Sequence, residues 1–66
     1  MRISLNGKTT DSRGAKTVDD LVGHLGLPPE TVLIEHNGVA LHRREWRQIP
    51  LAEGDLIEIV RVVAGG

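Results

Sequence analysis

The sequence predicts an α+β fold in which one helix packs across one face of a mixed sheet of four to five strands. Three observations support this fold class. Asn-Gly pairs at positions 6–7 and 37–38 are the strongest short-range signal for β-hairpins. An apolar stripe with helical spacing lies between the two pairs. A run rich in β-branched residues, at positions 56–63, comes near the end of the chain.

The first hairpin begins at the N-terminus. Met1 to Leu5 alternates apolar and polar residues with the period of a half-buried strand. Asn6-Gly7 is expected to form the turn, since both of its central positions require a positive φ. Lys8 to Ser12 then returns as a polar second strand, which we expect at an edge of the sheet.

A short helix is predicted to begin after Thr17, whose side chain can accept hydrogen bonds from the free backbone amides. Asp20 stands at the capping-box position three residues later. The stripe predicted to face the core consists of Val18, Leu21, Val22 and Leu25. Gly26 suits the left-handed position that ends a helix, and the prolines at 28–29 prevent the helix from continuing.

The second hairpin is predicted to join strands at 32–36 and 39–41 through Asn37-Gly38. Because Glu35 is expected to be exposed, Val32 and Ile34 should face the core.

The segment after this hairpin is predicted to contain little sheet. His42 to Arg47 reads as a turn or short helical segment that lays Trp46 over the domain as a lid. Gln48 to Leu51 is expected to be a short extended piece at an edge, because Pro50 has no N–H group to donate.

The last strand, Leu56 to Val63, is predicted to be the longest. Ile57 and Ile59 share one face, whereas Val60 and Val62 lie on the opposite face. Two interpretations follow. The strand is covered on both sides, or Val60 and Val62 form an exposed apolar surface on which a partner docks.

This strand must pair somewhere in the sheet. If it lies parallel to the first strand and between the two hairpins, it fills the sheet and leaves the C-terminus free at one end. That is the ubiquitin-like β-grasp arrangement. We therefore expect a β-grasp domain at residues 1–63 and a flexible diglycine tail at 64–66.

Composition excludes several classes of protein. The chain has 66 residues, which is enough for one small domain, and it has no cysteine. Its formal net charge of −1 offers no strong field for nucleic acid or anionic lipid, so neither nucleic acid nor a membrane is expected as a partner. No apolar run approaches membrane-spanning length, so a soluble cytoplasmic protein is the expectation.

No catalytic group and no metal site are predicted in the body of the chain. The three histidines lack metal-ligand spacing, and neither serine lies in a nucleophile-elbow context. Nucleotide-binding glycine motifs are absent, so we expect no cofactor bound by this chain. The cluster Arg43, Arg44 and Arg47 is interpreted as a solvated face, with contact to an acidic partner as the alternative.

The C-terminal carboxylate is the candidate functional group. Gly65 and Gly66 lack Cβ atoms, so the tail can pass through a channel that side chains would block. A carboxylate is a poor electrophile. Transfer of AMP from ATP would convert it to a mixed anhydride, which a sulfur or amine nucleophile could then attack. The groups that handle phosphate would belong to a partner.

Over essentially its whole length the chain resembles the ThiS family, the small sulfur carriers of thiamine biosynthesis. The residues that carry the resemblance are Asn37-Gly38, Arg43-x-x-Trp46, Gly54-Asp55-x-Ile57-x-Ile59 and Val63-Ala64-Gly65-Gly66.

The resemblance implies a β-grasp fold and a carrier that is not itself an enzyme. It implies that an E1-like adenylyltransferase, which would bind the ATP and Mg²⁺, adenylates Gly66. A sulfur-donating enzyme would then supply the sulfur of a thiocarboxylate, which is delivered to thiazole synthase. Ala64 and Gly65 would thread the partner's channel.

Other functions stay open. The sister carrier that feeds molybdopterin synthase shares the fold and the Gly-Gly end, but it resembles this chain less in length. A ubiquitin-like modifier, a β-grasp interaction module with an inert tail and a stand-alone enzyme are further alternatives. The enzyme is the weakest of them, because the chain offers no catalytic constellation.

Overall fold

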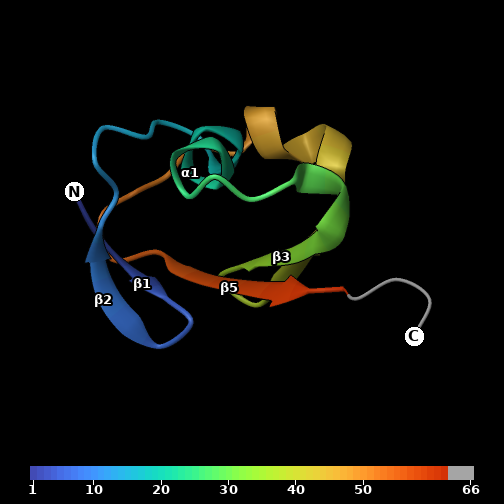
Figure 1. The fold of residues 1–66 in the computed structure, drawn as a ribbon. Coiled ribbons are helices and arrows are strands. Elements are labelled where there is room, and N and C mark those ends of the chain that lie inside the picture. The colour runs from blue at the N-terminus through green and yellow to red at the C-terminus, as the bar shows by residue number, and fades with distance from the viewer. Residues whose placement is uncertain (63–66) are drawn as a thin grey trace.

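The computed structural model describes residues 1–62, which form a five-stranded mixed sheet with helical segments on one face (Figure 1). The elements are β1 (Arg2–Leu5), β2 (Lys8–Asp11), α1 (Val18–His24), η1 (Pro29–Thr31), β3 (Val32–His36), β4 (Val39–Leu41), η2 (Arg43–Gln48) and β5 (Leu56–Arg61), where η marks a 3₁₀ helix. The α+β class and the single α-helix across the sheet are confirmed.

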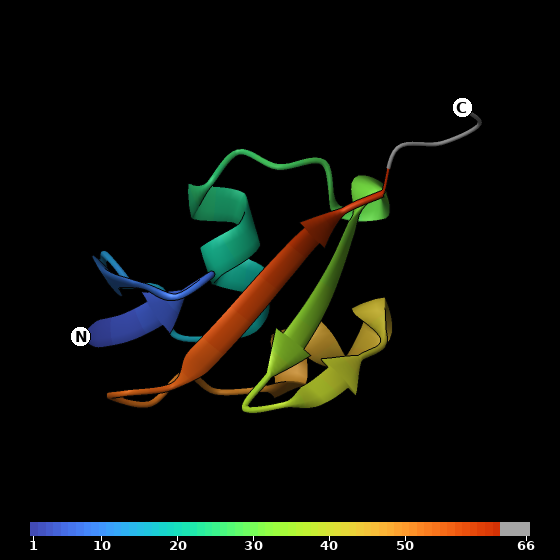
Figure 2. The same ribbon diagram turned by 90° about the horizontal axis from the view of Figure 1, so that it is seen from below.

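Strand β5 lies in the middle of the sheet, whose order is β2-β1-β5-β3-β4. It runs parallel to β1, with Leu5 opposite Ile57, and antiparallel to β3, with Ile34 opposite Ile59. Figure 2 shows β5 between these two neighbours. The predicted β-grasp pairing is confirmed. The strand ends at Arg61, two residues before the predicted end, and Val63 lies outside the described residues.

Both hairpin turns have the conformation that their Asn-Gly pairs predict. Asn6 and Gly7 have φ angles of 51° and 81°, and Asn37 and Gly38 have φ angles of 51° and 84°. Positive φ at both central positions matches the twist of the flanking strands. Strand β2 ends at Asp11, one residue earlier than predicted.

Helix α1 begins with the predicted capping box. The hydroxyl of Thr17 accepts a hydrogen bond from the Asp20 amide at 3.1 Å. In return, the Asp20 carboxylate accepts from the backbone N–H groups of Thr17 (3.2 Å) and Lys16 (3.0 Å). These bonds satisfy donors that the first turn of a helix leaves free.

The end of α1 corrects one prediction. Gly26 has a φ of 69°, and the chain closes with a bond from the Leu27 amide to the Val22 carbonyl at 3.4 Å, as in a Schellman cap. Leu25, predicted to face the core, is 40% exposed. It is the C-cap residue, where the chain leaves the helix axis, so its side chain lies at the margin of the apolar stripe.

Residues 42–51 differ from the prediction in two ways. Trp46 is only 1% exposed and belongs to the core itself, so it does not act as a surface lid. The segment from Gln48 to Leu51 is not an edge of the sheet. Its backbone pairs with the start of α1, where the amides of Val18 and Leu51 donate to the Ile49 and Lys16 carbonyls at 3.1 and 2.9 Å. These bonds flank Pro50, which has no amide hydrogen to donate.

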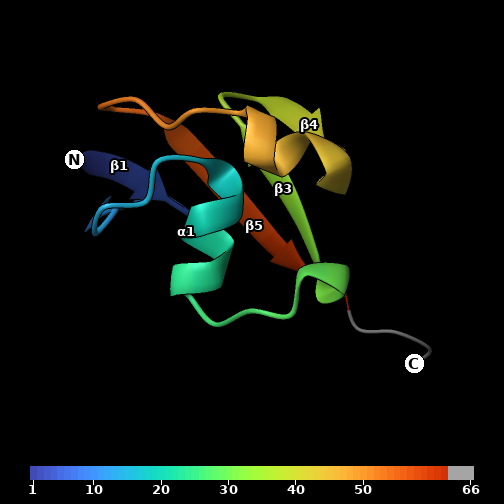
Figure 3. The ribbon, with the colours of Figure 1, turned by 90° about the horizontal axis from the view of Figure 1, so that it is seen from above.

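The core lies between the sheet and the layer formed by α1 and η2 (Figure 3). Its buried apolar members are Ile3, Ala15, Val18, Leu21, Val22, Val32, Ile34, Trp46, Leu51 and Ile57. On β5, Ile57 is 1% exposed whereas Val60 is 58% exposed. The interpretation that β5 is covered on both sides is therefore wrong for the described residues.

Candidate functional site

An apolar patch lies on the uncovered face of the sheet near the end of β5. Val60 and Leu33 are paired across β5 and β3, and they are 58% and 61% exposed. Val62, two residues further along, is 46% exposed. Figure 2 shows this face of the sheet with the helices behind it. We call Leu33, Val60 and Val62 the β5 patch.

The sequence analysis identified two of these three residues. It placed Val60 and Val62 opposite the core, which the structure confirms, but it did not consider Leu33. A signal was present, because Leu33 stands between two core-facing residues and must point the other way in a strand. The role of the patch in docking stays a prediction.

A hydrogen-bonded carboxylate fixes the beginning of β5. The side chain of Asp55 accepts from the His36 Nε2 at 2.8 Å, from the Ala52 amide at 2.9 Å and from the Asn37 Nδ2 at 3.1 Å. Burial acts to raise the pKa of Asp55, but the bonds from these three donors outweigh it, and the pKa is lowered from its ordinary value. The spacing of His36, Asn37 and Asp55 in the sequence did not predict this network.

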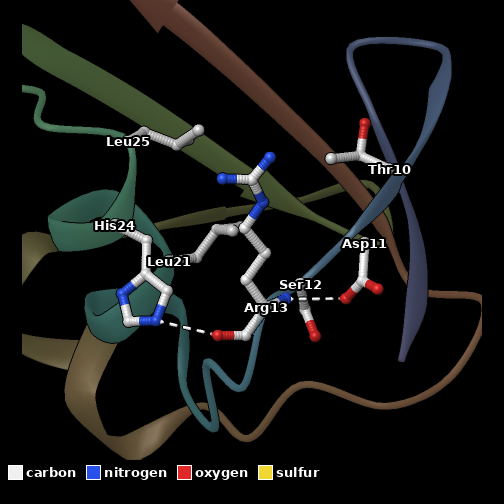
Figure 4. A pocket seen from close by; sticks show the side chains of 7 residues that line it. All are labelled: Thr10, Asp11, Ser12, Arg13, Leu21, His24 and Leu25. Carbon is white, nitrogen blue, oxygen red and sulfur yellow. Dashed lines mark hydrogen bonds between the residues drawn. The ribbon is translucent and has the colours of Figure 1, made fainter.

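A small pocket of about 300 Å³ lies between β2 and α1 (Figure 4). His24 Nε2 donates to the Arg13 carbonyl at 3.1 Å, and the Asp11 carboxylate accepts from the Arg13 amide at 2.8 Å. That amide, and after it the N-terminal ammonium, lowers the pKa of Asp11. Ser12 is buried at 2% exposure. These contacts hold the connection before α1 in place.

The predicted arginine cluster surrounds a hollow of about 400 Å³. It is lined by Asp19, Arg43, Arg44 and Arg47. All four side chains are exposed, and within residues 1–62 no carboxylate lies within ion-pair distance of these arginines. The exposed position agrees with the interpretation as a solvated face, and contact with an acidic partner stays a prediction.

Two further observations concern the described residues alone. Residues 1–62 contain no group of three or more histidine, cysteine, aspartate or glutamate side chains placed to hold a metal ion. None of their helices is long and apolar enough to cross a bilayer. The residues predicted to carry the chemistry, Ala64, Gly65 and Gly66, lie outside the described part of the chain.

Comparison with protein families gives a match to a model described as the ThiS family, over residues 3–66. Among solved structures, the crystal structure of a thiamine biosynthesis protein (ThiS) from Geobacter metallireducens is similar, with a TM-score of 0.82, 30% identity and 100% of both chains covered. A solution structure of a thiamine biosynthesis protein from the same organism gives a TM-score of 0.80 at 30% identity, covering 100% of this chain and 88% of that one.

Two curated relatives are much longer proteins. They are thiazole synthases of Magnetococcus marinus and Paramagnetospirillum magneticum, 35% and 30% identical over 66 residues. The match covers 100% of this chain but 20% of each relative, so the chain spans about a fifth of their length.

Proposed function

The chain belongs to the ThiS family, and we propose that it is a sulfur carrier of thiamine biosynthesis. The observation that carries the proposal is the family match, which runs through Gly66, the residue that would bear the sulfur. Similarity over the full length to a solved thiamine biosynthesis protein supports the same assignment.

The proposed chemistry takes place at the carboxylate of Gly66. One carboxylate oxygen attacks the α-phosphorus of ATP, and pyrophosphate leaves. A sulfur nucleophile at the oxidation level of sulfide then attacks the acyl carbon, the bond to AMP breaks, and AMP leaves with the electron pair. One proton is released, and the product is a thiocarboxylate on Gly66.

Partners must supply what this chain lacks. It has no phosphate-binding glycine motif, so an E1-like adenylyltransferase is proposed to bind ATP and Mg²⁺, and a second enzyme to donate the sulfur. Thiazole synthase is the proposed acceptor. Two thiazole synthases include a segment similar to this chain, and that arrangement would keep such a carrier beside the synthase.

The β5 patch is the proposed docking surface for these partners. It lies where β3 pairs with the end of β5, the strand that leads toward the C-terminal residues, and its three apolar side chains are each 46–61% exposed. An apolar surface of this kind is a feature of protein contact sites. From this anchor, Ala64 and Gly65 would thread the active-site channel of the partner.

The test is a reconstitution with purified enzymes. The chain is incubated with ATP, the adenylyltransferase and a sulfur donor, and is then given either to thiazole synthase or to molybdopterin synthase lacking its own carrier. We expect its mass to rise by the difference between one sulfur and one oxygen atom, and thiazole to form. Sulfur transfer to molybdopterin synthase alone would favour the sister carrier, and an unchanged mass would favour an inert interaction module.

A further inference from the structure

The two edges of β5 are supported differently near its end. On the β3 edge the pairing continues to Arg61 opposite Val32, and the Val62 amide then donates to the Thr31 carbonyl at 2.7 Å. On the other edge, β1 ends at Leu5, which lies opposite Ile57. Strand β1 therefore supplies no partner for the last part of β5.

Asn6 takes the place of the missing strand residues. Its backbone amide donates to the Ile57 carbonyl at 2.9 Å. Its side-chain Oδ1 accepts from the Ile59 amide at 2.7 Å, and its Nδ2 donates to the Ile59 carbonyl at 3.2 Å. A carboxamide offers the same acceptor and donor as a peptide group. The side chain thus continues the β1 ladder beyond the point where the backbone turns away.

Asn37 makes a related contact at the other end of the same strand. Its Oδ1 accepts from the Leu56 amide at 2.8 Å, and its backbone amide donates to the Leu56 carbonyl at 2.8 Å. The two asparagines have the same φ of 51° and precede glycines in equivalent turns. They differ in position, since Asn37 holds Leu56 at the start of β5 and Asn6 holds Ile59, three residues closer to the C-terminus.

We propose that Asn6 is a positioning residue for the chemistry of the C-terminal carboxylate, an inference that rests on the proposed function. It fixes Ile59, from which the chain continues for seven residues to Gly66. Without its carboxamide, the β1 edge of the strand is free beyond Ile57. The direction in which the chain leaves the sheet is then less well defined, and the carboxylate reaches the partner's active site less often.

The positioning role of Asn6 can be distinguished experimentally from docking at the β5 patch. Leu33 and Val60 are paired with each other through the β3 ladder, which Asn6 does not contact. Loss of the Asn6 carboxamide should therefore leave the affinity of the carrier for the adenylyltransferase unchanged and slow the step that follows binding.

The experiment compares Asn6→Gly with Asn37→Gly in thiocarboxylate formation, with the carrier as the varied substrate. Glycine removes the carboxamide and tolerates the positive φ. For Asn6→Gly we expect kcat to fall about tenfold, with KM within about twofold of the wild type. For Asn37→Gly we expect a comparable loss of thermal stability but nearly normal kcat. Assays are run at a temperature where both variants are folded. Asn6→Asp serves as a second variant: it keeps an acceptor for the Ile59 amide but turns a charged oxygen toward the Ile59 carbonyl, so kcat should also fall while KM stays near the wild-type value.

The outcomes are distinguishable. Equal losses of kcat in the two glycine variants, or no loss in either, would overturn the role of Asn6 while leaving the carrier function intact. A wild-type chain that takes up no sulfur would overturn the proposed function and this inference together.

Discussion

The carboxylate of Asp55 accepts hydrogen bonds from His36, Asn37 and Ala52. The first two donors precede it by 19 and 18 positions. No local sequence pattern predicts these hydrogen bonds, because they depend on how the β3–β4 turn lies beside the start of β5. The capping box of Thr17 and Asp20, in contrast, is contained in four consecutive residues and was predicted.

Asp55 should make the fold sensitive to acid. Its pKa is lowered in the folded state, so the unfolded chain binds the proton more readily and stability rises with pH. The contribution of ionised Asp55 to the free energy of unfolding is complete at neutral pH. It is lost as the pH falls from the unfolded value of about 4 through the lower folded value.

Replacing Asp55 with asparagine should lower the free energy of unfolding at pH 7 by about 1–3 kcal/mol, since the donors of three partly buried hydrogen bonds lose a charged acceptor. The variant should also lose less stability than the wild type between pH 5 and pH 2. Denaturant unfolding across this pH range measures both effects, with Glu58→Gln as an exposed control. If Asp55→Asn and the wild type lost the same free energy of unfolding between pH 5 and pH 2, this role of Asp55 would be contradicted.

At the scale of elements, strand β5 connects the fold to the proposed site. The sequence left two interpretations of this strand open, and the exposure of Val60 agrees with an uncovered apolar face, while docking on that face stays a prediction. Its position beside β1 also followed from sequence, because a strand at the end of the chain had to fill the gap between two hairpins. The segment at 48–51 was assigned wrongly, since its partners near Lys16 and Val18 are more than thirty positions away.

The β5 patch should bind partners through Val60. Val60→Asp places a charge in the proposed contact and should weaken binding to the adenylyltransferase by at least about tenfold. Because Val60 is 58% exposed, thermal unfolding should change little. Titration calorimetry and a melting curve measure the two effects.

The matched control lies on the same strand and the same face. Leu56 is 57% exposed but stands at the opposite end of β5, so Leu56→Asp should leave binding nearly unchanged. Equal weakening by both substitutions, or weakening that follows a loss of folded protein, would argue against a docking patch at Val60.

At the scale of the whole molecule, the chain combines a sheet that is covered on one face with C-terminal glycines that we propose to be functional. The hairpins and the helix were predictable because they follow from local turn, capping and alternation rules, and the strand order followed because the last strand had to pair between the two hairpins. The support of β5 by Asn6 was not predictable, because the carboxamide meets a residue 53 positions away. The fold places the asparagines and Asp55 around a single strand, the one that leads to Gly66.

The central claim is that the carboxylate of Gly66 carries all of the reactivity. The most direct test is the intact mass of a synthetic chain whose C-terminus is a carboxamide, incubated with ATP, the adenylyltransferase and a sulfur donor beside the unmodified chain. The account predicts that the unmodified chain exchanges one oxygen for sulfur and that the amidated chain, with the same melting curve, gains nothing. An equal gain of sulfur by the amidated chain would contradict it.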